Sequence, residues 1–182
     1  MLEIRQILNS QSEAALASIL GENISITFPN AWIDINREGV STSSISLFKY
    51  DSQSYVIVDT DLAETNSGWL EYAIVNVFLA DLPHHIEDPE KASNDKPYNV
   101  CTLLTWKPTI IQSVSIYQQS RLTETEIVKY DSGILLEFDS GRVLFSSTDS
   151  FPDRLEINHK ETIIEELLRS MTIRKTLNQL VN

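Results

Sequence analysis

The sequence has one cysteine and no long hydrophobic run. These two features argue against a disulfide-stabilised protein and against a protein with membrane-spanning helices. Cys101 has no second cysteine with which to form an internal disulfide, which indicates a reducing compartment. No apolar run approaches the roughly 20 residues that a membrane-spanning helix needs. The first residues, Met1–Arg5, lack the basic region and apolar segment of a secretory signal. We therefore expect a cytoplasmic protein that does not enter a membrane.

Glycine is also scarce, and the motifs that depend on it are absent. None of the five glycines lies in a phosphate-binding loop, a dinucleotide fingerprint or a Gly-x-Ser-x-Gly nucleophile elbow. Cys101 lies in an apolar stretch, where a buried and unreactive thiol is the ordinary outcome. We therefore predict a non-catalytic protein without a cofactor. An enzyme whose site assembles from residues distant in the sequence remains an alternative.

Basic residues are missing from one long segment. The chain has a net charge of −12, and the segment Tyr50–Glu90 contains nine carboxylates but no lysine or arginine. We call this segment the acidic window. Recognition of nucleic acid requires clustered lysine and arginine, and anionic membranes repel negative charge. The charge therefore predicts that the protein binds neither nucleic acid nor a membrane surface.

What the sequence does contain is a series of short β-strand patterns. The segment Glu126–Ser147 alternates apolar runs with Asp131–Gly133 and Asp139–Gly141, two Asp-Ser-Gly triplets that are typical of turns. In the run between the triplets, the residues Ile134–Phe138 alternate between two faces. The pattern predicts a β-meander with both triplets as turns. Replacing Phe138 or Phe145 with alanine should cost roughly 3–5 kcal/mol if the ring is buried.

Other strand patterns lie on either side of the acidic window's first turn. Ser44–Tyr50 and Tyr55–Asp59 predict a hairpin, and Trp69–Leu79 is a long run with apolar residues on both faces. Such a two-sided run is typical of a strand in the middle of a sheet. Residues 81–97 contain three of the six prolines among polar residues, so we predict a long surface loop there.

Helical patterns occur at the two ends of the chain. We predict one or two short helices within Leu2–Leu20, and a C-terminal helix that Asn158 caps and that ends near Met171. Residues Thr172–Leu177 would then form a short closing strand. With 182 residues and 42% hydrophobic content, the simplest organisation is one domain over residues 1–182. The predicted fold class is α+β, with a mainly antiparallel sheet, curved or two-layered, and helices at both ends.

One cluster has the composition of a metal site. His84 and His85 stand beside several carboxylates, but adjacent histidines in an extended backbone point in opposite directions. No third ligand follows at a recognised spacing. We therefore predict a solvated loop there and no metal, with His84 and His85 as weak candidates.

The acidic window is the feature that separates this chain from a generic domain. Tryptophan and tyrosine are common at binding hot spots, and carboxylates steer basic partners by long-range attraction. We hypothesise a protein that neutralises a basic protein partner, in the way that inhibitors and toxin-immunity proteins act. An alternative is a homo-oligomeric structural protein that pairs through a sheet edge at Tyr55–Asp59. The candidate binding residues are Asp59, Asp61, Glu64, Trp69, Glu71 and Tyr72.

Overall fold

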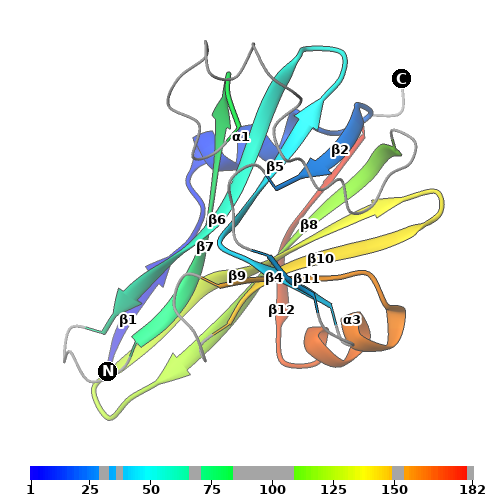
Figure 1. The fold of residues 1–182 in the computed structure, drawn as a ribbon. Coiled ribbons are helices and arrows are strands. Elements are labelled where there is room, and N and C mark those ends of the chain that lie inside the picture. The colour runs from blue at the N-terminus through cyan, green and yellow to red at the C-terminus, as the bar shows by residue number, and fades with distance from the viewer. Residues whose placement is uncertain (29–32, 36–38, 66–70, 84–108, 149–153, 180–182) are drawn as a thin grey trace.

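The computed structural model describes six stretches of the chain, which are residues 1–28, 33–35, 39–65, 71–83, 109–148 and 154–179. These residues form twelve strands and two short helices (Figure 1). The helices are α1 (Ser10–Ala17) and α3 (Glu161–Leu168). The strands are β1 (Leu2–Gln6), β2 (Asn23–Thr27), β3 (Ile33–Ile35), β4 (Val40–Thr42), β5 (Ser44–Lys49), β6 (Ser54–Glu64), β7 (Glu71–Ala80), β8 (Thr109–Leu122), β9 (Glu126–Phe138), β10 (Gly141–Ser147), β11 (Leu155–Asn158) and β12 (Thr172–Asn178).

The predicted α+β class is wrong, because the fold is a large, mostly antiparallel sheet with only short helices among the described residues. The clearest error lies at the N-terminus, where the expected helix over Leu2–Leu8 is strand β1. It runs parallel to β9, with Ile4 opposite Val128. Leu2 and Ile4 alternate with Glu3 and Arg5, so the period of two prevailed over the helical period once a partner strand was available. Neither of the helices α1 and α3, each eight residues long, could span a bilayer.

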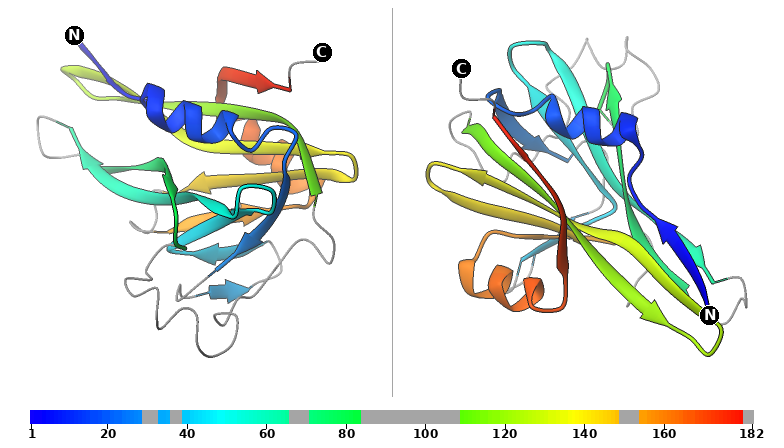
Figure 2. Two further views of the ribbon diagram at one scale, coloured as in Figure 1. Left: turned by 90° about the horizontal axis from the view of Figure 1, so that it is seen from above. Right: turned by 180° about the vertical axis from the view of Figure 1, so that it is seen from behind.

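The sheet folds over itself into two layers that share β8. The strand order is β3-β4-β11-β10-β9-β8-β2-β5-β6-β7, and β1 and β12 branch from β9 and β8. Most of β8 pairs with β9, whereas its first residues, Thr109 and Ile110, pair with β2. Seen from above, the two halves of the sheet face each other (Figure 2). Nearly all the pairs are antiparallel, as expected of strands joined in sequence by short turns.

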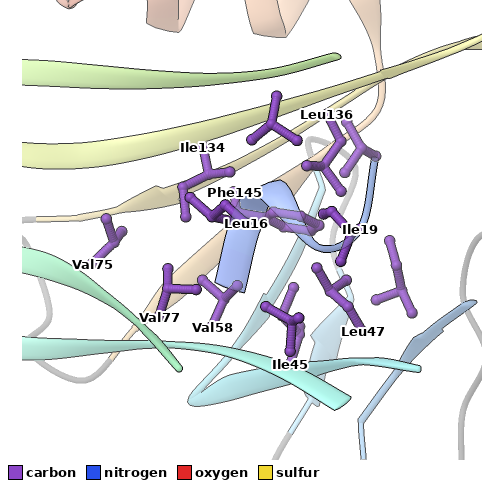
Figure 3. Close-up of a cluster of buried hydrophobic side chains, with 14 of the residues drawn as sticks. Leu16, Ile19, Ile45, Leu47, Val58, Val75, Val77, Ile134, Leu136 and Phe145 are labelled. Atoms are coloured by element: carbon purple, nitrogen blue, oxygen red, sulfur yellow. The ribbon is translucent and has the colours of Figure 1, made fainter. Parts of the chain in front are cut away.

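The interior between the layers is one hydrophobic cluster (Figure 3). It includes Val58 of β6, Val75 of β7 and Phe145 of β10, with exposed fractions of 0%, 2% and 0%. Helix α1 adds Leu16 to the same cluster. Its N-cap is Asn9, whose side chain accepts a hydrogen bond from the Ser12 amide at 2.9 Å. The helix predicted after Ser10 is therefore present, although it ends at Ala17.

Helix α3 packs on the outer face of strands β9 and β10, on the side away from the main core. Ile164 packs against Leu135 and Leu144, which alternate with core residues along β9 and β10. The closing strand predicted over Thr172–Leu177 is confirmed as β12. The predicted cap is wrong: Lys160 occupies the N-cap without a side-chain hydrogen bond, and Asn158 is buried in β11.

The meander is half confirmed. The second triplet forms the β9–β10 turn, and Gly141 has a φ of +153°, which favours glycine. The first triplet is not a turn, because β9 continues through Asp131–Gly133. Gly133 lies opposite Tyr117 and Asp131 opposite Gln118, so Ser132 is the extra residue of a β-bulge. Pairing with β8 before and after the bulge keeps the backbone extended where the local turn preference predicted a reversal of the chain.

The hairpin predicted from Ser44–Tyr50 and Tyr55–Asp59 is confirmed as β5–β6. Residues Tyr55–Asp59 pair with β5 on one side and β7 on the other, so the proposed oligomer edge is not free. The run predicted as a central strand is β7, which ends the strand order. Its two apolar faces have another cause: Val75 and Val77 pack in the main core, and Tyr72 packs in a second cluster. Most of the predicted 81–97 loop lies outside the described residues.

Candidate functional site

Three of the nine carboxylates of the acidic window lie toward one end of the β6–β7 hairpin, at the last residues of β6 and the first residue of β7. Glu64 lies directly opposite Glu71, and Asp61 lies opposite Ile74 three positions earlier on β6. Asp61, Glu64 and Glu71 are exposed, and none of them has an ion pair with a described residue. We call these three residues the acidic hairpin end. Asp59 lies further along the hairpin and is half-buried.

The direct Glu64–Glu71 pair should cost stability, because like charges opposite each other across two strands repel. Glu71→Lys should therefore raise the free energy of unfolding by about 0.2–1 kcal/mol at low salt. Urea denaturation measures the change, and Glu71→Gln, which removes only the repulsion, should give a smaller increase. A loss of stability in both variants would show that the two carboxylates do not repel each other.

Tyr72 does not accompany the carboxylates on the surface. Its exposed fraction is 1%, and its ring centroid lies 4.8 Å from that of Tyr130, with an angle of 40° between the rings. Burial raises the pKa of Tyr72, so the phenol stays neutral. Tyr72 thus anchors the hairpin to β9. Trp69, His84, His85 and Cys101 lie outside the described residues.

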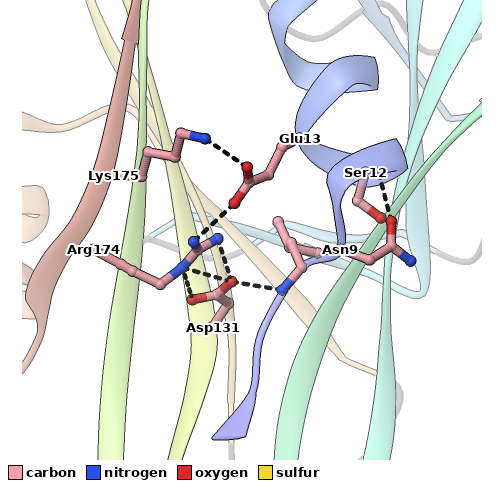
Figure 4. Close-up of polar contacts among 7 residues, drawn as sticks. Asn9, Ser12, Glu13, Asp131, Arg174 and Lys175 are labelled. Carbon is pink, nitrogen blue, oxygen red and sulfur yellow. Dashed lines mark hydrogen bonds and ion pairs between the residues drawn. The ribbon is translucent and has the colours of Figure 1, made fainter.

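A second polar constellation lies where α1, β9 and β12 meet (Figure 4). Its centre is Asp131, with an exposed fraction of 1%. One carboxylate oxygen, Oδ2, accepts hydrogen bonds from the Leu8 amide at 2.8 Å and from Arg174 Nη2 at 2.8 Å. The other oxygen, Oδ1, accepts from Arg174 Nε at 2.8 Å. The Arg174 guanidinium therefore grips the carboxylate with two of its nitrogens, the strongest geometry for such a pair.

The constellation extends to the first turn of α1. Arg174 Nη1 donates to Glu13 Oε1 at 2.8 Å, and Lys175 Nζ donates to Glu13 Oε2 at 2.6 Å. We call Glu13, Asp131, Arg174 and Lys175 the ion cluster. The hydrogen bond from Lys175 is the main reason why the pKa of Glu13 is lowered. Burial raises the pKa of Asp131, although Arg174 and the Leu8 amide oppose that effect.

Two β-bulges orient the side chains of Asp131 and Arg174 toward each other. Ser132 is the extra residue of β9, immediately after Asp131. In β12 the register shifts between Ile173 and Lys175, so Arg174 is the extra residue of that strand. Bulges commonly redirect a side chain, and here they lie on either side of β8. The Arg174 side chain thereby reaches across to Asp131.

The ion cluster is built to hold elements together more than to do chemistry. Both oxygens of Asp131 and both oxygens of Glu13 already accept hydrogen bonds from neighbouring groups. The hydrogen bonds from Arg174 and Lys175 favour the ionised form of these carboxylates, which makes them weaker acceptors of a substrate proton. Charge neutralisation is also complete within the cluster, because two cations face two carboxylates.

Sequence reasoning missed the ion cluster. Asp131 belongs to an Asp-Ser-Gly triplet that resembles a turn, and its main partner, Arg174, is 43 residues away. One signal was present: continuing the helical face of the C-terminal helix would have buried a cation at Arg174 or Lys175. That pattern predicted a helix end near Met171, whereas α3 ends at Leu168, and a cation next to the core also indicates a buried carboxylate as its partner.

Metal ligation finds no support in the described stretches of the chain, where histidine, cysteine and carboxylate side chains form no group of three that could hold an ion. Comparison with known proteins adds no family to this geometry. No family model, no curated protein and no solved structure matches the chain.

Proposed function

We propose that the protein is a non-catalytic binding protein of the cytoplasm whose acidic hairpin end contacts a basic protein partner. The observation that carries the proposal is the direct pairing of Glu64 with Glu71, both exposed and without an ion pair to a described residue. Asp61 adds a third exposed carboxylate to the same hairpin, on the opposite face from Glu64 because the two residues are three positions apart on β6. A cation placed between the two glutamates would replace their repulsion by two attractions.

The placement of these charges favours binding over general solubility. Cross-strand pairs in sheets usually combine opposite charges or apolar groups, because like charges in this position are destabilising. Local rules of this kind are broken mainly at functional sites, where another benefit offsets the cost. Elsewhere on the molecule carboxylates do meet cations, as where Arg142 bridges Glu161 and Glu165. The carboxylates of the acidic hairpin end are not neutralised by any described cation, so their negative charge can attract a partner.

The charges also determine which partners are suitable. A negative surface steers a positive partner toward it and repels nucleic acid, so the partner should be a protein rich in lysine and arginine. Attraction of this kind acts over about 10 Å at 0.1 M salt and weakens at higher ionic strength. Association should therefore be faster at low salt, with a smaller effect on dissociation.

Charge reversal tests the proposal without disturbing the fold. Glu64→Lys combined with Glu71→Lys keeps a like-charge pair at the same position, so stability should change little while the sign of the surface inverts. The probe is a fluorescent peptide rich in lysine and arginine, followed by anisotropy at low and at physiological ionic strength. We expect the variant to lose most of the binding that the wild-type protein shows.

The matched control reverses the same number of charges elsewhere. Asp139→Lys combined with Glu166→Lys alters two exposed carboxylates outside the hairpin and changes the net charge by the same amount. This variant should retain near wild-type binding. Equal losses in the two variants would show that only the net charge matters, and retained binding by the hairpin variant would refute the proposal.

A further inference from the structure

Strand β12 is attached to the molecule by few apolar contacts. It pairs with β8 alone among the described strands, and most of its side chains face water. Leu177 packs against the main core from outside as a partly buried residue, and no β12 residue is among the buried core residues. Apolar burial, which stabilises most strands, therefore contributes little here. The backbone pairing with β8 and the ion cluster must supply the attachment.

The ion cluster connects β12 to two other elements. Arg174 contacts Asp131 of β9 and Glu13 of α1, and Lys175 contacts Glu13 (Figure 4). Hydrogen bonds to charged groups contribute more than neutral ones, and those to Asp131 lie in a buried environment. A change in the charge of either carboxylate would therefore weaken β12 more than it would weaken the rest of the sheet.

We propose that β12 is a releasable strand, which detaches from β8 as a unit when Glu13 of the ion cluster takes up a proton, while the two-layered core stays folded. The proposal is independent of the acidic hairpin end. It assigns the ion cluster a role as a proton-sensitive attachment of the C-terminal strand.

The direction of the pH effect follows from comparing the attached and detached states. Asp131 is faced by Arg174 from β12 and by Glu13 from α1, and Glu13 is faced by Arg174 and Lys175. When β12 leaves, Asp131 loses the hydrogen bonds from Arg174 that lower its pKa and also loses cover that raises it, so the two changes oppose each other. Glu13 loses the two cations that lower its pKa. Glu13 therefore binds a proton more tightly in the detached state, so acidification favours detachment through Glu13.

The rest of the molecule has reason to remain folded during this opening. The main cluster is formed by α1 and by strands of both layers, with members such as Leu16, Ile45 and Phe145 at 0% exposure. Proteins open locally in cooperative units, and the units with few buried contacts open at the lowest cost. An exposed strand that pairs with one described strand and is held by ion pairs meets that description.

Hydrogen exchange measured by mass spectrometry tests the proposal. Protection of the β12 amides is compared with that of the β9–β10 hairpin from pH 7 to pH 4.5, after correction for intrinsic exchange. The β12 opening constant should rise by up to about tenfold per pH unit for each proton taken up, whereas the β9–β10 hairpin should stay protected. Glu13→Gln combined with Asp131→Asn removes both titrating groups, so β12 opening should become independent of pH.

Two further variants keep the test decisive. Glu13→Gln alone removes one titrating group at the surface of α1 and should reduce the pH dependence of β12, even if the double variant does not fold. Glu161→Gln combined with Glu165→Gln is the matched control, because it removes two carboxylates that bind Arg142 away from β12. This control should behave like the wild-type protein. Equal loss of protection in β12 and the β9–β10 hairpin, or wild-type pH dependence in Glu13→Gln, would overturn the proposal.

Discussion

Replacing Arg174 with methionine should lower the free energy of unfolding by about 3–5 kcal/mol. The methionine keeps much of the apolar stem but leaves Asp131 with a buried, unpaired negative charge, since its exposed fraction is 1%. Breaking a buried ion pair from one side is costly because the remaining charge has neither water nor a partner. Urea denaturation at neutral pH, followed by circular dichroism, measures the change.

Two companion variants separate the buried pair from ordinary surface charge. Lys175→Met should cost under about 1 kcal/mol, because that side chain is 44% exposed and its bond to Glu13 is screened by water. Asp131→Asn combined with Arg174→Met should be less destabilised than Arg174→Met alone, because the amide oxygen can still accept from Leu8 without a charge. Similar losses for Arg174→Met and Lys175→Met would contradict the central role assigned to Asp131.

Replacing Phe145 with alanine should also cost about 3–5 kcal/mol. The ring is fully buried in the main core, between the two layers of the sheet, so its removal leaves a cavity (Figure 3). Phe145 lies on β10, which pairs with β9 on one side and β11 on the other, so this strand has little freedom to move into the space. The chevron or equilibrium denaturation of the variant, compared with the wild-type protein, gives the difference directly.

Phe138 is the matched control for Phe145. The sequence predicted the same cost for both rings, but Phe138 is only partly buried where it packs against the core. Phe138→Ala should therefore cost about 1–2 kcal/mol, because part of the ring is already in water. Equal effects of the two substitutions would mean that burial does not distinguish the two ends of the β9–β10 hairpin.

The sequence alone determined those parts of the fold that depend on neighbouring residues. The predicted alternation of Leu135 with Ile134 and Leu136 between two faces is confirmed, because Ile134 and Leu136 pack in the main core and Leu135 packs in the cluster that includes Ile164 of α3. The Asp139–Gly141 turn, the β5–β6 hairpin and the closing strand also follow from local patterns. In each case the period of the strand or the conformational freedom of a turn residue acts within a few positions of the chain.

Tertiary structure decided the features that depend on distant partners. Leu2–Gln6 became a strand because β9 was there to pair with it, and Asp131 stayed within a strand because β9 pairs with β8 along nearly its whole length. Tyr72 is buried because it packs on Tyr130 of β9. Arg174 contacts Asp131 because each strand has a β-bulge at that point, and no local sequence pattern predicts these bulges. The negative charge of the acidic window can be counted in the sequence. That Glu64 and Glu71 lie directly opposite each other depends on the register of β6 and β7. The register of two strands depends on contacts along their whole length, so it cannot be predicted from a short segment of either strand.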